Sequence, residues 1–416
     1  MLKVISTCRL CGAASLPRVI DLGDFRFTGV FPLPRSSVGG GPLCLVRCGT
    51  CGLVQLEHEY DARDLYGEHY GYRSGLNPSM VRHLSEAATA LAGRVGLGNG
   101  DIALDIGCSD GTFLAALADR GALLTGFDPS AGKFQRFHPP GLIFIEDFFS
   151  AAAFRERFPN RQAKLITSIA MFYDLAHPLE FAREVATVLA DDGLWHLEQS
   201  YLPLMLETNA YDTICHEHTE YYALEQIDWI MRRAGLSILD VQLNDVNGGS
   251  FAVTVSKGDT RAHGPVNRVA HLLERENALK LDTGRPFRDF MRRVEAQRKE
   301  FRETLERLRT EGQRVFGYGA STKGNVILQY CGITPDLVQC IAEINPDKFG
   351  HETPGTRIPI VSEAEARAQR PNYFLVLPWH FRRGIVAREQ SFLSEGGRLI
   401  FPLPALEICS AASLVR

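Results

Sequence analysis

The chain has 416 residues, of which 45% are hydrophobic and 23% are charged. This length exceeds what one ordinary hydrophobic core accommodates, so two or three domains are expected. A formal net charge of -4 gives no attraction to nucleic acid or to anionic membranes, and it favours a small molecule as the partner. No apolar run is long enough to span a membrane and no signal peptide precedes the first motif, so the sequence predicts a cytoplasmic protein.

Two Cys-x-x-Cys-Gly motifs lie near the N-terminus, formed by Cys8 with Cys11 and by Cys48 with Cys51. Each can place two thiolates on one tetrahedral ion, so together they predict a structural zinc site. The separation of the pairs is long for a zinc ribbon, which indicates a hairpin-rich segment between them. Cys44 is a competing ligand with less regular spacing, and four unrelated thiols are the alternative.

A tyrosine-rich, glycine-punctuated stretch follows at residues 64–77, before a helix expected to begin near Pro78. It is typical of a loop that covers a site. The tyrosines can equally be packing aromatics, and both interpretations stay open. The candidates for substrate contact or catalysis in this stretch are Tyr70, Tyr72, Arg73, Ser74 and Asn77.

The next segment predicts a strand, a glycine turn and a helix, Ile102-Ala-Leu-Asp105-Ile-Gly107-Cys-Ser-Asp110-Gly111. Ser109 stands where a dinucleotide-binding loop has its second glycine. The pattern Asp-x-Gly-x-x-x-Gly instead resembles motif I of the class I S-adenosylmethionine methyltransferases.

Three further segments agree with an α/β sheet that binds this cofactor. A second strand ends in Asp128, where a carboxylate can accept both ribose hydroxyls. Asp147 and Phe148 offer an acid and an aromatic face for adenine. A third strand leads to Met171 beside the methionine part. The predicted cofactor residues are Asp105, Gly107, Asp110, Asp128, Asp147, Phe148 and Met171.

The segment from Tyr211 to Tyr222 is the densest in chemistry-bearing side chains and includes His216-Glu217-His218. Histidine titrates near neutrality and an adjacent carboxylate can orient it, so an acid–base role is expected, with a plain surface turn as the alternative. The segment precedes an apolar helix. An antiparallel hairpin is then predicted from residues 238–243 and 250–256.

Charged helices with an apolar stripe are expected from 266 to 309, with a break before Pro286. A second Rossmann-like domain begins at Arg314-Val-Phe-Gly317-Tyr-Gly319-Ala-Ser321-Thr322-Lys323. Its hydroxyls and lysine at a helix start favour a pyrophosphate, although the loop could be only a tight turn. The predicted substrate residues here are Gly319, Ser321, Thr322, Lys323 and Glu343.

The cysteine pairs, the methyltransferase core with His-Glu-His and the C-terminal Gly-Tyr-Gly-Ala-Ser-Thr-Lys-Gly-Asn stretch together resemble the sugar C-methyltransferases over nearly the whole chain. The resemblance implies a zinc-binding module at 1–65, an S-adenosylmethionine-dependent domain with a lid and helix at 66–260, and a connector with a nucleotide-sugar-binding Rossmann-like domain at 261–416. It implies methylation of a nucleotide-linked 4-keto-6-deoxy sugar next to the ketone, with C-3 favoured.

By this resemblance, His218 is the general base. Glu217 would orient an imidazole, while His216, Tyr70, Tyr72 and Tyr222 are candidates to assist or to stabilise an enolate. Cys215 and Asp174 depart from the family, which commonly has tyrosine and histidine at these positions, so those two roles do not transfer. An O- or N-methyltransferase for a sugar nucleotide and, further off, a zinc-containing protein that binds or modifies nucleic acid are the alternatives; a nicotinamide oxidoreductase lacks its third glycine.

Overall fold

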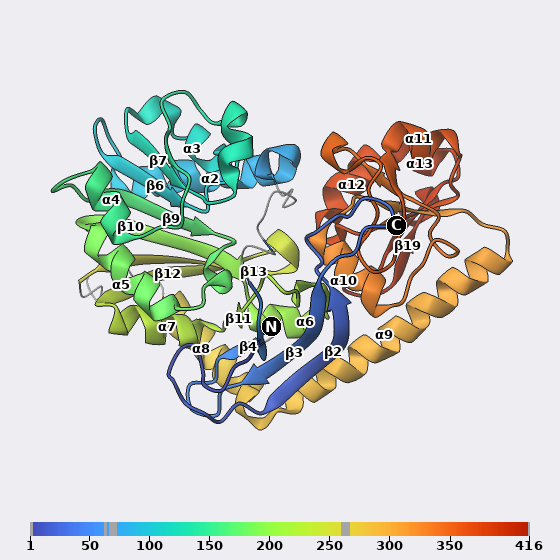
Figure 1. Ribbon diagram of the computed structural model, residues 1–416, viewed down its shortest axis with the longest axis horizontal. Helices are drawn as coiled ribbons and strands as arrows, with labels where there is room; N and C mark the ends of the chain where they lie inside the picture. Colours follow the sequence, from blue (N-terminus) through green and yellow to red (C-terminus); the bar gives the residue numbers. More distant parts are fainter. Residues whose placement is uncertain (1–2, 62–64, 66–72, 259–266, 415–416) are drawn as a thin grey trace.

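The computed structural model describes residues 3–61, 65, 73–258 and 267–414. Two α/β lobes lie side by side, and the N-terminal strands lie at their junction (Figure 1). Tyr70 and Tyr72 fall outside the described residues. No helix within the described ranges is long and apolar enough to cross a bilayer.

The N-terminal module is built on an antiparallel sheet whose strand order is β11-β4-β3-β2. The expected hairpin between the cysteine pairs is present as β2 and β3, and β1 pairs with β5 outside this sheet. Strand β11 comes from the histidine-rich segment, so that segment extends the N-terminal sheet. The strands are β1 (Lys3–Val4), β2 (Arg18–Arg26), β3 (Gly40–Arg47), β4 (Val54–Leu56), β5 (His58–Glu59) and β11 (Glu220–Tyr221).

The central lobe has a sheet of strand order β12-β13-β10-β9-β6-β7-β8. Strands β8, β7, β6, β9 and β10 are parallel, and β13 runs antiparallel to β10 and β12, as the predicted hairpin requires. The strands are β6 (Ile102–Ile106), β7 (Leu123–Phe127), β8 (Ile143–Ile145), β9 (Ala163–Ile169), β10 (Leu189–Ser200), β12 (Leu236–Asn244) and β13 (Ser250–Lys257).

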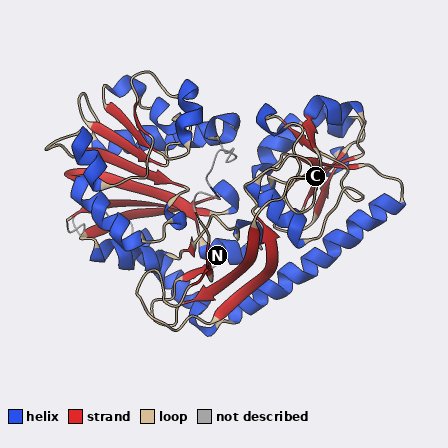
Figure 2. Ribbon diagram, viewed as in Figure 1, coloured by secondary structure: helices blue, strands red, loops and turns tan. Residues whose placement is uncertain are grey.

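Helices cover this sheet on its two faces (Figure 2). Helix α2 begins where predicted: Asn77 accepts a hydrogen bond from the Ser79 N–H, and Pro78 occupies the first turn. It ends at Gly96, whose φ is 64°. The helices are α2 (Pro78–Val95), α3 (Thr112–Ala115), α4 (Ala151–Arg157), α5 (Pro178–Val188), α6 (Leu202–Glu207) and α7 (Leu224–Arg233).

Two helices connect the lobes, α8 (Arg268–Leu279) and α9 (Arg285–Thr310). The predicted break is at Gly284, whose φ is 66°, with Pro286 in the first turn of α9. The apolar stripe of α9 is buried as expected, except that Met291 is half-buried. In Figure 1, α9 runs along the C-terminal lobe and reaches β2 of the N-terminal module.

The C-terminal lobe is a second Rossmann-like sheet of order β16-β15-β14-β17-β18-β19. All strands are parallel except β19, which is antiparallel to β18. The elements are β14 (Val315–Tyr318), α10 (Thr322–Tyr330), β15 (Ile341–Glu343), β16 (Ile360–Ser362), α11 (Glu363–Ala368), β17 (Tyr373–Val376), α12 (Arg382–Arg388), α13 (Gln390–Ser394), β18 (Arg398–Phe401) and β19 (Glu407–Cys409).

One hydrophobic core joins the N-terminal module to the C-terminal lobe, since Leu43 and Leu45 of β3 belong to the same buried cluster as Phe287 of α9 and Phe316 of β14. Residues of the first and second cysteine motifs belong to the core of the central lobe instead. The N-terminal module therefore packs against both lobes, and the histidine-rich segment lies within this junction.

Candidate active site

The cysteine site forms as predicted. The sulfur atoms of Cys8, Cys11, Cys48 and Cys51 lie within 4.8 Å of one another. Each motif closes through the same backbone bond, in which the glycine after the pair donates to the first cysteine carbonyl at 2.9 and 3.1 Å. Further N–H groups point at Sγ of Cys8 and Cys48 at 3.4 Å, which favours thiolates. Four close sulfurs with such donors fit a closed structural Zn²⁺ site. Cys44 lies on β3 opposite Asp21, outside this cluster.

A pocket of about 280 Å³ opens over the carboxyl ends of the parallel strands of the central sheet. This is where open parallel sheets bind ligands. Every predicted cofactor residue except Asp110 lines it. Asp110 instead accepts hydrogen bonds from the Gly75 N–H at 2.9 Å and the Thr112 hydroxyl at 2.6 Å, and so connects the end of the tyrosine-rich stretch to the glycine turn.

The glycine turn is held by the acid at the end of the next strand. Gly107 has φ 80°, and a Cβ there would lie 3.2 Å from Met171. The Asp128 carboxylate accepts from the Ser109 N–H at 2.9 Å and from the Ser130 N–H at 2.8 Å. A carboxylate has about four acceptor positions, so Asp128 retains capacity for a ribose hydroxyl.

Two acids with different surroundings belong to the pocket. Asp105 is buried beneath the turn, which raises the pKa of its carboxyl to about 7, while the Thr167 hydroxyl donates to it at 2.7 Å. Asp147 is exposed and precedes Phe148, which is 61% exposed. An open aromatic face with an adjacent carboxylate suits an adenine ring, so the pocket fits S-adenosylmethionine.

The described part of the tyrosine-rich stretch flanks the same pocket. Ser74 lines it. Arg73 lies 3.6 Å from the Asp110 carboxylate and stacks over Phe137 at 3.5 Å from the ring centroid. Asn77 caps helix α2. Arg73 and Asn77 thus have structural partners, while Ser74 faces the cavity.

His218 does not line the pocket, but it lies close to the pocket wall and is held in one orientation. Its Nδ1 lies 2.7 Å from the Thr213 carbonyl oxygen, which can only accept, so Nδ1 carries the proton and Nε2 the lone pair. Its ring contacts that of Tyr173 at 4.1 Å between centroids, and the next residue, Asp174, lines the pocket. Burial and the charge of Lys323 lower the pKa of His218 to about 3. The imidazole is therefore neutral at pH 7.

The preceding histidine faces a different part of the molecule. His216 donates through Nε2 to the Gly41 carbonyl at 3.1 Å and packs between the rings of Phe27 and Tyr60. Burial lowers its pKa to about 4. Its contacts are with the N-terminal module, and it does not line the pocket.

Glu217 and Tyr222 are also buried away from the pocket. The Thr28 hydroxyl lies 3.5 Å from the Glu217 carboxylate, and burial raises the pKa of that carboxyl. Asn325 of α10 donates to the Thr28 carbonyl at 2.7 Å. Tyr222 packs against Phe172 in the central core. None of these residues lines the pocket; His218 comes near it through Tyr173, and its neighbours contact the N-terminal module or the central core.

The polar groups of the second glycine turn mostly form hydrogen bonds with residues of the same lobe. Gly319 has φ 78°, and the Glu343 carboxylate accepts from the Ala320, Ile344 and Asn345 N–H groups at 2.7–2.8 Å. Ser321 caps α10 by accepting from the Gly324 N–H at 3.0 Å. The hydroxyl of Thr322 would be 3.6 Å from a Cβ on Gly29. These residues lie where α10 packs against the start of the histidine-rich segment.

Contacts between the lobes were not evident in the sequence. Lys323 donates to the carbonyl oxygen of Asn247, a residue that lines the cofactor pocket. Trp379 donates through Nε1 to the buried Asp212 carboxylate at 2.8 Å. These partners are 76 and 167 residues apart in the chain, so no local spacing indicates them.

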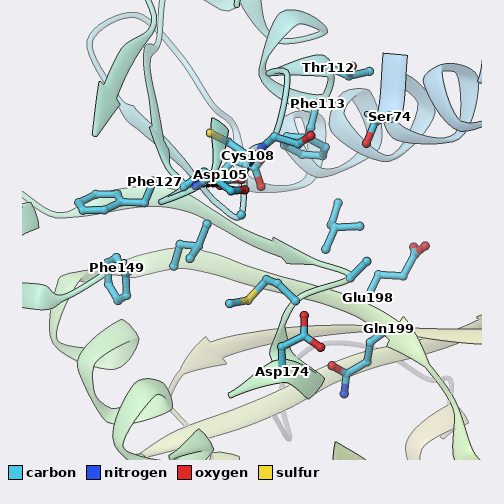
Figure 3. Close-up of a pocket in the computed structure, with 18 of the residues that line it drawn as sticks. Ser74, Asp105, Cys108, Thr112, Phe113, Phe127, Phe149, Asp174, Glu198 and Gln199 are labelled. Atoms are coloured by element: carbon cyan, nitrogen blue, oxygen red, sulfur yellow. Dashed lines mark hydrogen bonds between the residues drawn. The ribbon is translucent and has the colours of Figure 1, made fainter. Parts of the chain in front are cut away.

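Several pocket residues were left out of the predicted site, and two of them are adjacent polar residues on one strand. Glu198 and Gln199 lie at the end of β10 and line the pocket. The available signal was their place at the carboxyl end of a parallel strand, the same signal that identified Asp128. Figure 3 shows both near Asp174, at the opposite end of the cavity from Phe127 and Phe149.

Comparison with known proteins agrees with this organisation. Family models match residues 8–66 as a proposed zinc binding domain, residues 80–241 as a methyltransferase domain and residues 245–404 as a C-methyltransferase C-terminal domain. The C-methyltransferase NovU of Streptomyces niveus is 31% identical over 418 residues, which cover 99% of each chain.

Two similar solved structures each cover less than half of this chain. The magnesium protoporphyrin IX methyltransferase ChlM of Synechocystis PCC 6803 is 15% identical, with a TM-score of 0.35 over 47% of this chain and 93% of that chain. The CcbJ methyltransferase of Streptomyces caelestis is 13% identical, with a TM-score of 0.34 over 48% and 97%. The fold assignment therefore rests on the strand order above. The full-length relative and the three matched modules establish that this chain belongs to the C-methyltransferase family, as an S-adenosylmethionine-dependent enzyme with a structural zinc site.

Proposed function

We propose that the enzyme methylates a carbon next to the ketone of a nucleotide-linked 4-keto-6-deoxy sugar, with C-3 favoured, in the biosynthesis of a branched deoxysugar. A carbon acid of this kind needs a base and a group that stabilises the enolate oxygen, each typically worth about 10²–10⁴-fold in rate. The observation that carries the proposal is the neutral imidazole of His218, which has a defined lone pair, contacts Tyr173 next to the pocket residue Asp174, and lies near the cation of Lys323.

His218 is the proposed general base. The Thr213 carbonyl holds the proton on Nδ1, so Nε2 is available to accept the proton from the carbon next to the ketone. Lys323 lowers the pKa of His218 in the free enzyme. A bound diphosphate would offset that charge and raise the basicity of the imidazole when the substrate is present.

The C-terminal lobe is the proposed site of the nucleotide diphosphate. Ser321, Thr322 and Lys323 stand at the start of α10, where a helix favours anions. Glu343 holds the glycine turn in shape through its three backbone bonds. The bond of Lys323 to Asn247 brings this helix start to the edge of the cofactor pocket, so one substrate could reach both lobes.

The central lobe is the proposed site of the methyl donor. S-adenosylmethionine supplies an electrophilic methyl group on a sulfonium sulfur. Asp128 would bind its ribose, and Asp147 with Phe148 its adenine, at one end of the cavity. Ser74 lines the cavity and would contact the bound donor. These residues bind and orient, and the pocket walls keep water from the reacting carbon.

His216 and Glu217 are proposed to position the base and not to contact the substrate. Their contacts with Gly41 and Thr28 hold the segment against the N-terminal module. Tyr70 and Tyr72 remain candidates for assisting the enolate by their place in the sequence alone.

The test is solvent exchange in heavy water with thymidine diphosphate-4-keto-6-deoxyglucose and S-adenosylhomocysteine. Wild type should wash deuterium into the carbon next to the ketone, and His218→Ala should not. His177→Ala, which removes an exposed histidine of the same lobe, is the matched control and should exchange at the wild-type rate.

Product NMR completes the experiment with S-adenosylmethionine. A new C-methyl signal supports the proposal, whereas a methoxy or N-methyl signal would assign the enzyme to heteroatom methylation. Near-full methyl transfer by His218→Ala would remove this histidine from the base role.

A further inference from the structure

Among the residues that line the pocket, Gln199 is a buried polar side chain with two polar atoms that lack a hydrogen-bond partner. Gln199 lies near the end of β10, is 2% exposed and lines the cavity. Neither its Oε1 nor its Nε2 has a hydrogen-bond partner among the residues that the structure describes. An amide removed from water without a partner destabilises the fold, whereas a leucine or methionine of similar size would not. A ligand that bonds to the amide would account for its presence.

The neighbouring polar groups at this end of the cavity are occupied. His83 of α2 lies 2.7 Å from Glu198 through Nε2. The Ser250 hydroxyl donates to the Val246 carbonyl at 2.8 Å. Both Glu198 and Ser250 line the pocket, so these two neighbours of Gln199 have partners within the protein whereas its amide has none among the described residues.

The position of Gln199 separates it from the cofactor residues. Asp105 and Asp128 stand at β6 and immediately after β7, whereas Gln199 stands on β10, with β9 between β10 and β6. Figure 3 shows Gln199 beside Asp174, and Tyr173, which precedes Asp174, contacts the ring of His218. The amide therefore lies on the side of the cavity nearest to the proposed base.

A carboxamide offers a donor and an acceptor a short distance apart. A ketone with a hydroxyl on the next carbon presents the complementary acceptor and donor. We propose that the Gln199 carboxamide binds this hydroxy ketone of the acceptor sugar, with Nε2 donating to the keto oxygen and Oε1 accepting from the hydroxyl. This inference rests on the proposed function and adds a catalytic residue to it.

The bond to the keto oxygen would strengthen during deprotonation. The C–H bond next to the ketone breaks, its proton goes to Nε2 of His218, and its electron pair forms the carbon–carbon double bond. The carbonyl π electrons move onto oxygen, so a negative charge appears where the Gln199 N–H points. Removing one such donor typically lowers the rate by about 10²–10³-fold.

The experiment compares Gln199→Leu and Gln199→Glu with wild type. Leucine removes both amide groups, and glutamate keeps an acceptor but loses the donor. Both should lower the rate of deuterium exchange and kcat for methyl transfer to thymidine diphosphate-4-keto-6-deoxyglucose by about 10²–10³-fold. S-adenosylhomocysteine affinity by calorimetry should stay within about twofold. Gln242→Leu, an exposed glutamine on β12 of the same sheet, should match wild type throughout.

Two results would overturn the inference. Wild-type exchange by Gln199→Leu would show that the amide does not bind the keto oxygen. If the Gln199 variants bound S-adenosylhomocysteine more weakly but exchanged deuterium at the wild-type rate, Gln199 would bind the methyl donor and not the sugar. Absence of exchange and methyl transfer in wild type would instead overturn the proposed function itself, so the two failures are distinct.

Discussion

The central sheet and the C-terminal sheet have the same order of parallel strands. The first runs β8, β7, β6, β9, β10 and then antiparallel β13; the second runs β16, β15, β14, β17, β18 and then antiparallel β19. In each sheet a glycine with positive φ follows the strand that comes first in the chain: Gly107 follows β6 and Gly319 follows β14. An acid stands at the end of the strand that comes second in the chain: Asp128 at β7 and Glu343 at β15.

The surroundings of the two turns differ. In the central lobe the turn borders a cavity, and Asp128 lines it. In the C-terminal lobe Glu343 accepts three backbone N–H groups, and Lys323 reaches the other lobe. A shared turn therefore does not determine a shared ligand; the side chains around it and the neighbouring lobe decide which ligand can enter.

The largest expected effect is on the pH dependence of stability, and it comes from an acid that precedes the glycine turn of the central lobe but not that of the C-terminal lobe. Asp105 stands two residues before Gly107, and the corresponding residue before Gly319 is Gly317, where a Cβ would clash with Ile341 at 2.3 Å. Asp105 has a pKa of about 7 in the folded chain against 3.8 for the ordinary group. The folded state holds this proton between those values while the unfolded chain releases it, so this group makes stability fall as pH rises from 4 to 7.

Asp105→Asn lacks this dependence. Its free energy of unfolding relative to wild type should rise by about 4 kcal/mol from pH 4 to pH 7 and level off above pH 7. Denaturant unfolding of the cofactor-free protein measures this difference. Asp119→Asn, at an exposed acid of the same lobe, should show no such trend. If the difference in unfolding free energy between Asp105→Asn and wild type did not change with pH either, Asp105 would not be a neutral acid in the folded protein.

The next effect tests the cation at the second turn. Lys323→Met should lower kcat/KM for the sugar nucleotide by about 10²-fold, because a buried charged partner is typically worth about 2–5 kcal/mol. S-adenosylhomocysteine affinity should be unchanged. Lys299→Met, at an exposed lysine of α9, is the control. If Lys323→Met weakened only the binding of S-adenosylhomocysteine, the lysine would belong to the methyl-donor site and not to the sugar-nucleotide site.

A smaller effect separates the two acids. Asp128→Asn should weaken S-adenosylhomocysteine binding about tenfold, since a hydrogen bond to a charged group is worth about 1.5–3 kcal/mol. Glu343→Gln should leave that affinity unchanged and weaken sugar-nucleotide binding. Calorimetry with each ligand measures both. If both variants weakened binding of the same ligand, the assignment of the methyl donor to the central sheet and of the sugar nucleotide to the C-terminal sheet would be wrong.

The smallest effect concerns the glycines. Alanine at Gly107 or Gly319 is forced into the left-handed region, which costs about 1–2 kcal/mol of stability in either lobe. Only Gly107→Ala should also weaken S-adenosylhomocysteine binding. Thermal unfolding and calorimetry separate the two results. Gly384→Ala, within α12 and with open space around it, should cause neither loss.

Local spacing predicted much of this architecture. The zinc cluster follows from two short motifs, and the start of α2 follows from Asn77 and Pro78. The glycine turns and the strands that flank them were also located in the sequence, because turn geometry depends on a few adjacent residues. The same local rules indicated Asp128 and Phe148 beside the cofactor pocket.

The sequence could not separate the roles of two adjacent histidines. His216 and His218 share one tripeptide, yet one donates to Gly41 in the N-terminal module and the other to Thr213 within the same segment. The difference arises because β11 pairs with β4, which aligns the segment with a distant part of the chain. Gln199 likewise becomes notable only when its missing partners are known.

The sequence by itself determined the modules, the metal ligands and the class of cofactor, since each depends on residues close together in the chain. Only the tertiary structure decided the partners of the histidine-rich segment, in which Thr213 holds His218 and Gly41 holds His216. It also brought Lys323 to Asn247 and Trp379 to Asp212 across the lobes. Such contacts depend on how the N-terminal module packs between two separately folded sheets, and burial there sets the protonation of His218.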